Sequence, residues 1–113
     1  NIALVSLLAS RPVIGYENHA GRTHLGEGLE PFGQVVSTTG HGNNDKSGAD
    51  GVRYKNVIGT YLHGPLLGKN PEIADWLLKT ALSRKFEENV KLEPLDDSVE
   101  LNANGFMANR LIK

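Results

Sequence analysis

The sequence predicts an α/β protein in which a mixed sheet packs against helices. Short runs of β-branched and aliphatic residues, divided by glycine- and proline-containing turns, occupy residues 1–62. Two stretches with apolar residues at helical spacing follow them. The first three strand-like runs have no helix between them, which favours antiparallel pairing, whereas the last run leads into a helix. The length of 113 residues allows one modest domain or part of a larger one.

Four strand-like runs are expected, at residues 1–8, 13–16, 31–37 and 57–62. Arg11-Pro12 separates the first two, because the residue before a proline is kept out of the helical region. The polar, glycine-rich stretches between the later runs are predicted to be loops, at 17–30 and 39–50. The chain enters its first run at Ile2 with no lead-in, so we expect the N-terminal part of the domain to be missing.

The strongest helix signal begins at Asn70. Asn is a favoured N-cap, Pro71 suits the first helical position, and Glu72 places negative charge in the first turn. An apolar stripe at helical spacing continues the pattern, through Ile73, Ala74, Leu77, Leu78 and Ala81. Trp76 falls beyond the edge of this stripe. Two interpretations stay open for it, packing at the margin of the core or contact with a partner.

A second helix is predicted from about Ser98. Its expected buried face comprises Val99, Ala103, Phe106, Met107 and Leu111. Gly105 lies inside this helix and costs about 1 kcal/mol relative to Ala. The sequence contains no internal repeat and no low-complexity segment.

Composition excludes several classes of function. The net charge of −1 offers no basic patch for nucleic acid, and no apolar run approaches the ~18–20 residues of a membrane span. The chain has no cysteine, which excludes disulfide bonds and cysteine-based zinc sites and agrees with a cytoplasmic location. His19 and His24 form the one close histidine pair but lack HExxH-type spacing. We therefore expect no metal site and no cofactor.

The stretch "GYENHAGRTH" gathers polar side chains within a few residues, among them Glu17, Asn18, His19 and Arg22. One interpretation is a loop that lines a site, since loops carry a disproportionate share of functional residues. The other is an internally hydrogen-bonded turn with solvated charges. Composition alone leaves both open.

A second glycine-rich stretch, "TGHGNN" at residues 39–44, is predicted to be a mobile loop. It lacks the GxGxxG spacing and the following helix of a phosphate-binding turn, and no GK[ST] sequence is present. A phosphate cradle is therefore not supported.

His63 follows the run at 57–62 and precedes Gly64-Pro65. Catalytic groups in α/β sheets gather at the carboxyl ends of strands, and an imidazole titrates near neutral pH. His63 could therefore serve as a general base, or it could cap a strand end through backbone hydrogen bonds. A base needs a nucleophile to activate, and the chain has no cysteine and no G-x-S-x-G elbow.

Taken together, "GYENHAGRTHLG", "GQVV" and "NNDKSGADGVRYKNVIGTYLHGPLLGKNPEIADWLL" resemble the C-terminal half of class I glutamine amidotransferases of the CobQ/CobB type. The resemblance covers roughly residues 11–85. It implies a flavodoxin-like mixed sheet with helices, and it makes residues 1–113 the C-terminal portion of such a domain, with the N-terminal half missing. The pairing of "GYENHAGRT" with "GTYLHGP" in this order is specific.

The resemblance implies a chemistry for His63. Members of this family hydrolyse glutamine to glutamate and ammonia with a cysteine nucleophile, which the histidine of the "YLHGP" segment activates. That cysteine lies upstream in the family, so the chain alone is expected to be inactive. The family at large often places a carboxylate two residues after the histidine, where this chain has Pro65. The group that orients His63 is therefore expected elsewhere, with a partner subunit as one source.

The resemblance also suggests a partner and an acceptor. It is strongest to glutaminase subunits that work with a Mur-ligase-like (MurT-type) partner and amidate D-glutamate of lipid II in peptidoglycan synthesis. A corrinoid carboxylate, as in cobyric acid synthase and cobalamin biosynthesis, is the second choice. A non-catalytic binding module that retains the fold is a third interpretation. Because a partial sheet exposes an edge and an apolar face, we expect the isolated chain to self-associate.

Overall fold

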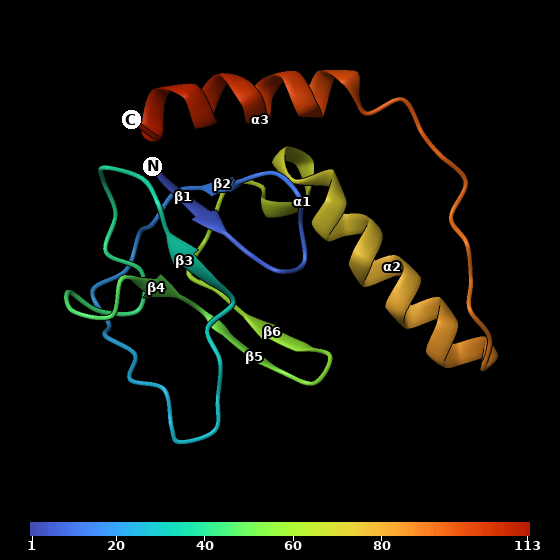
Figure 1. Ribbon diagram of the computed structural model, residues 1–113, viewed down its shortest axis with the longest axis horizontal. Coiled ribbons are helices and arrows are strands. Elements are labelled where there is room, and N and C mark those ends of the chain that lie inside the picture. Colours follow the sequence, from blue (N-terminus) through green and yellow to red (C-terminus); the bar gives the residue numbers. More distant parts are fainter.

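The computed structural model describes residues 1–113 and contains a four-stranded antiparallel sheet beside a two-stranded hairpin (Figure 1). The sheet has the order β2-β1-β3-β4, with strands at Ile2–Val5 (β1), Val13–Gly15 (β2), Gly33–Val35 (β3) and Ala49–Asp50 (β4). The combination of helices and strands is confirmed, as are the first three strands and their antiparallel pairing, but the predicted mixed sheet is not: every strand pair is antiparallel. β4 lies in a stretch predicted to be loop, and its two residues are too few for an alternating pattern to reveal it.

The central strand β1 is buried on both faces. On one face Ile2 and Leu4 belong to a cluster with four other fully or nearly buried side chains, Val13, Phe32, Leu62 and Ile73. On the other face Ala3 packs with Ile14 and Leu111. Successive residues of a strand point to opposite faces, so one short strand organises both halves of the core.

The predicted strand at 57–62 is wrong in its extent and in its burial. Residues Val52–Tyr54 (β5) and Val57–Gly59 (β6) instead form an antiparallel hairpin, and the side chain of Val57 is 65% exposed. The strand ends at Gly59 because the hydroxyl of Thr60 accepts the N–H of Leu62 at 3.1 Å, which bends the chain. Of the residues after the bend, Leu62 returns to the core.

The helix predicted at Pro71 is confirmed as α2 (Pro71–Phe86), preceded by the short α1 (Leu66–Lys69). Asn70 makes no side-chain cap; its amide instead bonds the backbone N–H and C=O of Ile14, at 2.7 and 2.8 Å. The predicted apolar stripe is only half correct. Ile73 is buried, but α2 runs away from the sheet (Figure 1), which leaves Leu78 56% exposed. Ala81 is exposed as well.

The last helix is confirmed as α3 (Ser98–Leu111), but three of its five predicted buried residues are exposed, namely Val99, Ala103 and Phe106. The buried positions are Asn104 and Leu111, flanked by partly buried Met107. Asn104 turns inward because its amide donates to the carbonyls of Pro12 and Lys69, at 2.8 and 3.0 Å. None of the helices is both long enough and apolar enough to cross a lipid bilayer.

Candidate functional site

His63 lies at the edge of the four-stranded sheet, beside the end of β2. Its N–H donates to the carbonyl of Tyr16 at 2.8 Å, and the N–H of Tyr16 donates back at 3.1 Å, which makes an isolated antiparallel bridge. The two aromatic rings lie 5.4 Å apart at 32°. The residue is exposed, and no side chain or backbone group of the chain hydrogen bonds its imidazole. The prediction that His63 directly follows a strand is therefore wrong, because β6 ends at Gly59. His63 is instead held by a backbone bridge to Tyr16.

Close packing brings this segment against β2. A Cβ atom built on Gly15 would lie 2.8 Å from the carbonyl oxygen of His63 and 3.0 Å from the Cβ of Leu62. The first distance is shorter than real Cβ atoms show and the second is unusually tight, so a side chain at position 15 would force the Leu62–His63 backbone or β2 to shift.

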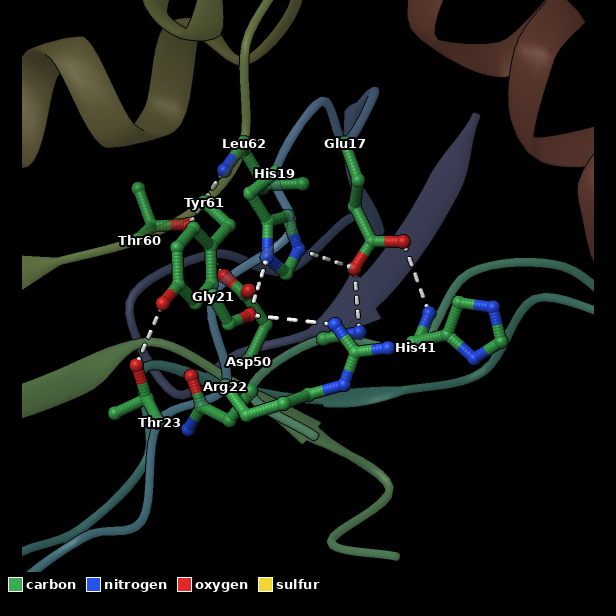
Figure 2. A network of polar contacts seen from close by, with 12 residues as sticks. Glu17, His19, Gly21, Arg22, Thr23, His41, Asp50, Thr60, Tyr61 and Leu62 are labelled. Carbon is green, nitrogen blue, oxygen red and sulfur yellow. Dashed lines mark hydrogen bonds and ion pairs between the residues drawn. The ribbon is translucent and has the colours of Figure 1, made fainter. Parts of the chain in front are cut away.

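Glu17 ties two loops together (Figure 2). Its carboxylate accepts the backbone N–H groups of His41, at 2.9 Å, and of Gly42, and it faces Nε2 of His19 at 3.4 Å. Burial raises the pKa of Glu17, but these backbone amides and the His19 ring outweigh it and hold the pKa below its ordinary value. The stretch 39–44, predicted to be a mobile loop, is therefore fastened to the sequence motif around Glu17.

His19 connects Glu17 to the segment that carries His63. Its Nδ1 lies 2.9 Å from the carbonyl oxygen of Gly21, so both ring nitrogens face oxygen acceptors. Its ring stacks on Tyr61 with centroids 3.6 Å apart and an interplanar angle of 5°. The Tyr61 hydroxyl is in turn 2.7 Å from that of Thr23 (Figure 2). Tyr61 is thus held at its ring face and at its hydroxyl.

Asp50 is a buried carboxylate at the end of β4, which sequence reasoning missed. One oxygen accepts the hydroxyl of Thr60, and the other, Oδ1, is buried without a hydrogen-bond partner. Burial raises the pKa of Asp50 above its ordinary value, against the opposing effects of the Thr60 hydroxyl and the Tyr61 backbone N–H. The sequence around it, "SGADG", has neither periodicity nor a second acid, so nothing local signalled a buried position.

The other predicted site residues, Asn18 and Arg22, make no hydrogen bond to Glu17, Tyr61 or Asp50, although Arg22 shares the Gly21 carbonyl with His19. Arg22 donates to the carbonyls of Ala20 and Gly21 at 3.2 and 3.4 Å, and its Nε faces Asp45 at 3.4 Å on the surface. Asn18 is exposed, in contrast to its neighbours Glu17 and His19. Within the motif, the structure brings Glu17 and His19 together with Tyr61 and leaves Asn18 outside. Nowhere in the chain do three acidic or histidine side chains converge as a metal site would require.

Comparison with known proteins gives a consistent result. The model of the CobB/CobQ-like glutamine amidotransferase domain matches residues 2–71, which include every residue of the network and His63. Subunit GatD of the glutamine-hydrolysing lipid II isoglutaminyl synthase of Streptococcus pneumoniae is 46% identical over 83 residues, 74% of this chain and 31% of the relative. The same subunit of Staphylococcus aureus is 44% identical over 101 residues, 87% of this chain and 38% of the relative.

A more distant similarity links the chain to cobyric acid synthase. The enzyme of Listeria innocua is 43% identical over 56 residues, which make up 50% of this chain and 11% of the relative. The chain thus spans about a third of the GatD sequences and a smaller part of the synthase.

Proposed function

This chain belongs to the CobB/CobQ-like glutamine amidotransferase family, and from that premise we propose that it carries the histidine of a glutaminase site. The observation that carries the proposal is the state of His63. Its backbone is fixed by two hydrogen bonds to Tyr16, while its imidazole is exposed and free of hydrogen bonds within the chain. A general base needs a fixed backbone and a ring that can reach its partner.

In the proposed reaction His63 takes the proton of a cysteine thiol, and the thiolate attacks the amide carbon of glutamine. The carbon–nitrogen bond breaks as His63 returns the proton to the leaving ammonia. Water then hydrolyses the thioester to glutamate and restores the thiol. The 113 residues contain no cysteine, so the nucleophile comes from a segment outside them. In this proposal residues 1–113 are the C-terminal portion of a flavodoxin-like domain.

We assign the ammonia to a carboxylate acceptor of the GatD type. The two GatD relatives cover 74% and 87% of the chain, whereas the Listeria innocua synthase covers 50%. In this assignment a Mur-ligase-like (MurT-type) subunit receives the ammonia and amidates D-glutamate of lipid II. A corrinoid acceptor is the alternative, supported by the 43% identity to cobyric acid synthase.

The proposal is tested by ammonia release from glutamine, with the protein as its gene encodes it and a MurT-type subunit present. The His63→Ala variant should lose glutaminase activity by about 10²–10⁴-fold, the usual contribution of a positioned base. His24→Ala is a matched control, because His24 is exposed and outside the network, and it should retain the wild-type rate. Wild-type activity in His63→Ala would show that His63 is not the base, and a wild-type protein that releases no ammonia would favour the non-catalytic binding module.

A further inference from the structure

The four residues Thr60–His63 lie outside the regular strands, yet a different partner holds each of them. Thr60 is bound to Asp50, Tyr61 is stacked on His19, Leu62 is in the core, and the backbone of His63 is paired with Tyr16. A connection of four residues without regular structure is ordinarily among the more variable parts of a fold. This one has a partner at every position, which constrains the path of the chain into His63.

Asp50 is a buried carboxylate with one oxygen bonded to Thr60 and the other without a partner. A buried carboxylate is costly unless its oxygens are hydrogen bonded, and Oδ1 of Asp50 has no partner. A neutral side chain would occupy the end of β4 at lower cost. What the carboxylate provides is a strong acceptor for the Thr60 hydroxyl, which thereby points its remaining lone pairs at the N–H of Leu62. The resulting turn sets the path of the chain into His63.

The Glu17–His19 pair holds Tyr61, the residue that follows Thr60. Glu17 is fixed by two backbone amides of the 39–44 loop, and His19 by Glu17 and the Gly21 carbonyl. The rigid His19 ring then supports the face of Tyr61 at 3.6 Å. Tyr61 lies two residues before His63, and Leu62 between them is buried in the core. Holding Tyr61 therefore restricts rotation of the segment about its axis.

We propose that Asp50 and the Glu17–His19 pair are positioning residues, which act through Thr60 and Tyr61 to fix the direction in which His63 presents its imidazole. The inference rests on the proposed function of His63. It assigns to the motif "GYENH" and to Asp50 a specific task in the reaction, without contact to glutamine. Family members often have a carboxylate two residues after the histidine, where this chain has Pro65. In this proposal the contacts of Thr60 and Tyr61 take over the orienting part of that carboxylate's role.

The expected effect is on the rate of the chemical step. A displacement of about 1 Å in a catalytic group can lower a rate by about 10²-fold. Loss of the Thr60 hydroxyl or of the Tyr61 ring should therefore reduce kcat by about 10–100-fold and leave KM within about twofold. These side chains face their own partners in the fold, so glutamine binding should be preserved.

Two matched pairs of variants test the inference in the full-length protein with its partner subunit. Thr60→Val removes the hydroxyl at constant shape, and Thr60→Ser keeps it. Tyr61→Leu removes the stacked ring, and Tyr61→Phe keeps it while removing only the bond to Thr23. Thr60→Val leaves buried Asp50 without its hydrogen bond and can fail to fold, whereas the Tyr61 pair leaves Asp50 untouched. Circular dichroism and thermal unfolding identify the folded variants.

The second readout is the pH dependence of alkylation of the site cysteine by iodoacetamide. A correctly placed His63 raises the thiolate fraction near neutral pH. In Thr60→Val and Tyr61→Leu the pH at which alkylation reaches half its maximal rate (the half-point) should move towards about 8.5, the pKa of a free thiol. Thr60→Ser and Tyr61→Phe should keep the wild-type half-point and kcat. A purely structural role would lower the amount of active protein and leave this half-point in place.

The outcomes separate the two proposals. If the wild-type protein releases no ammonia, or if His63→Ala is fully active, the proposed function fails. If His63 is essential but folded Thr60→Val and Tyr61→Leu keep the wild-type kcat and alkylation profile, the positioning inference is overturned. Equal losses in Thr60→Val and Thr60→Ser would also overturn it, because the hydroxyl would then not be the cause.

Discussion

The backbones of Tyr16 and His63 exchange two hydrogen bonds, which joins the start of the "GYENH" motif to the end of the "GTYLH" motif. The two motifs are far apart in sequence, and each would be weak evidence of a function alone. Pairing at this point brings their side chains to one edge of the sheet. The bridge therefore explains why the motifs occur together.

The contact between Gly15 and His63 predicts that Gly15→Ala is disruptive. The new methyl group would lie 2.8 Å from a backbone oxygen, which cannot rotate away. Overpacking of this kind costs about 1–3 kcal/mol in the free energy of unfolding. Urea denaturation should show this loss, and glutaminase activity should fall with it because His63 is displaced.

Gly105→Ala is the control for that substitution. Nothing lies within 4 Å of a Cβ at Gly105, which is inside α3. Alanine there should raise the free energy of unfolding by about 0.5–1 kcal/mol. If Gly15→Ala were as stable as the wild type, the close approach of His63 to β2 would be contradicted.

Asn70 is predicted to be among the most sensitive polar residues for stability. The residue is 4% exposed, and its side-chain amide bonds both backbone groups of Ile14 and the carbonyl of Leu66. Asn70→Ala would leave buried backbone groups unpaired and should cost about 2–4 kcal/mol. Thermal and urea unfolding measure the loss. The exposed Asn102→Ala on α3 should change stability by less than about 0.5 kcal/mol, and an equal effect at both positions would refute the assignment.

The lowered pKa of Glu17 predicts a pH-dependent contribution to stability. The carboxyl has a lower pKa in the folded than in the unfolded protein, so its contribution is fully present above its ordinary value of 4.5. It is lost as the pH falls through the lower, folded value. Glu17→Gln should therefore be less stable than the wild type at neutral pH, and the difference should narrow in acid.

Urea unfolding at several pH values between about 7 and 3 measures this effect. Glu93→Gln on the exposed connector serves as the control and should show no such trend. A difference between Glu17→Gln and the wild type that stays constant over this range would contradict the role of the Glu17 carboxylate.

Exposed apolar side chains predict that the isolated chain of 113 residues self-associates. Leu7 is 92% exposed, and Val99 and Phe106 on α3 are 74% and 63% exposed. Large apolar groups in this state favour association. Sedimentation velocity should show oligomers, and the double variant Val99→Ser/Phe106→Ser should reduce them with little effect on stability. A compact monomer at high concentration would contradict the prediction.

Local signals in the sequence were sufficient for part of this fold. Runs of apolar residues located β1, β2 and β3, and Pro71 located the start of α2. The β5–β6 hairpin was missed because its turn lacks glycine; Lys55 takes the positive φ of 54° that usually signals one. The true buried face of α3 was missed because Asn104 is polar and finds its partners in distant parts of the chain.

The site was predictable to a similar degree. The resemblance singled out His63 and the stretch "GYENHAGRT". Sequence alone could not tell which of the four candidate residues in that stretch, Glu17, Asn18, His19 and Arg22, contact the segment before His63. Glu17 and His19 join the network because they meet the 39–44 loop and Tyr61, whereas Arg22 bonds carbonyls of its own loop and the surface residue Asp45. Asp50 was missed because its partner, Thr60, lies on the far side of the β5–β6 hairpin in the sequence, and the contact between them is a feature of the folded chain.

The most direct test of the role of His63 is chemical rescue of ammonia release from glutamine in the His63→Ala variant. Within these 113 residues His63 is exposed and its imidazole has no hydrogen-bond partner, so added imidazole would fill a position that no other side chain of this chain occupies. If His63 is the general base, the variant should be nearly inactive, and its rate should rise with imidazole concentration. A folded His63→Ala protein that hydrolyses glutamine at the wild-type rate without imidazole would contradict the account.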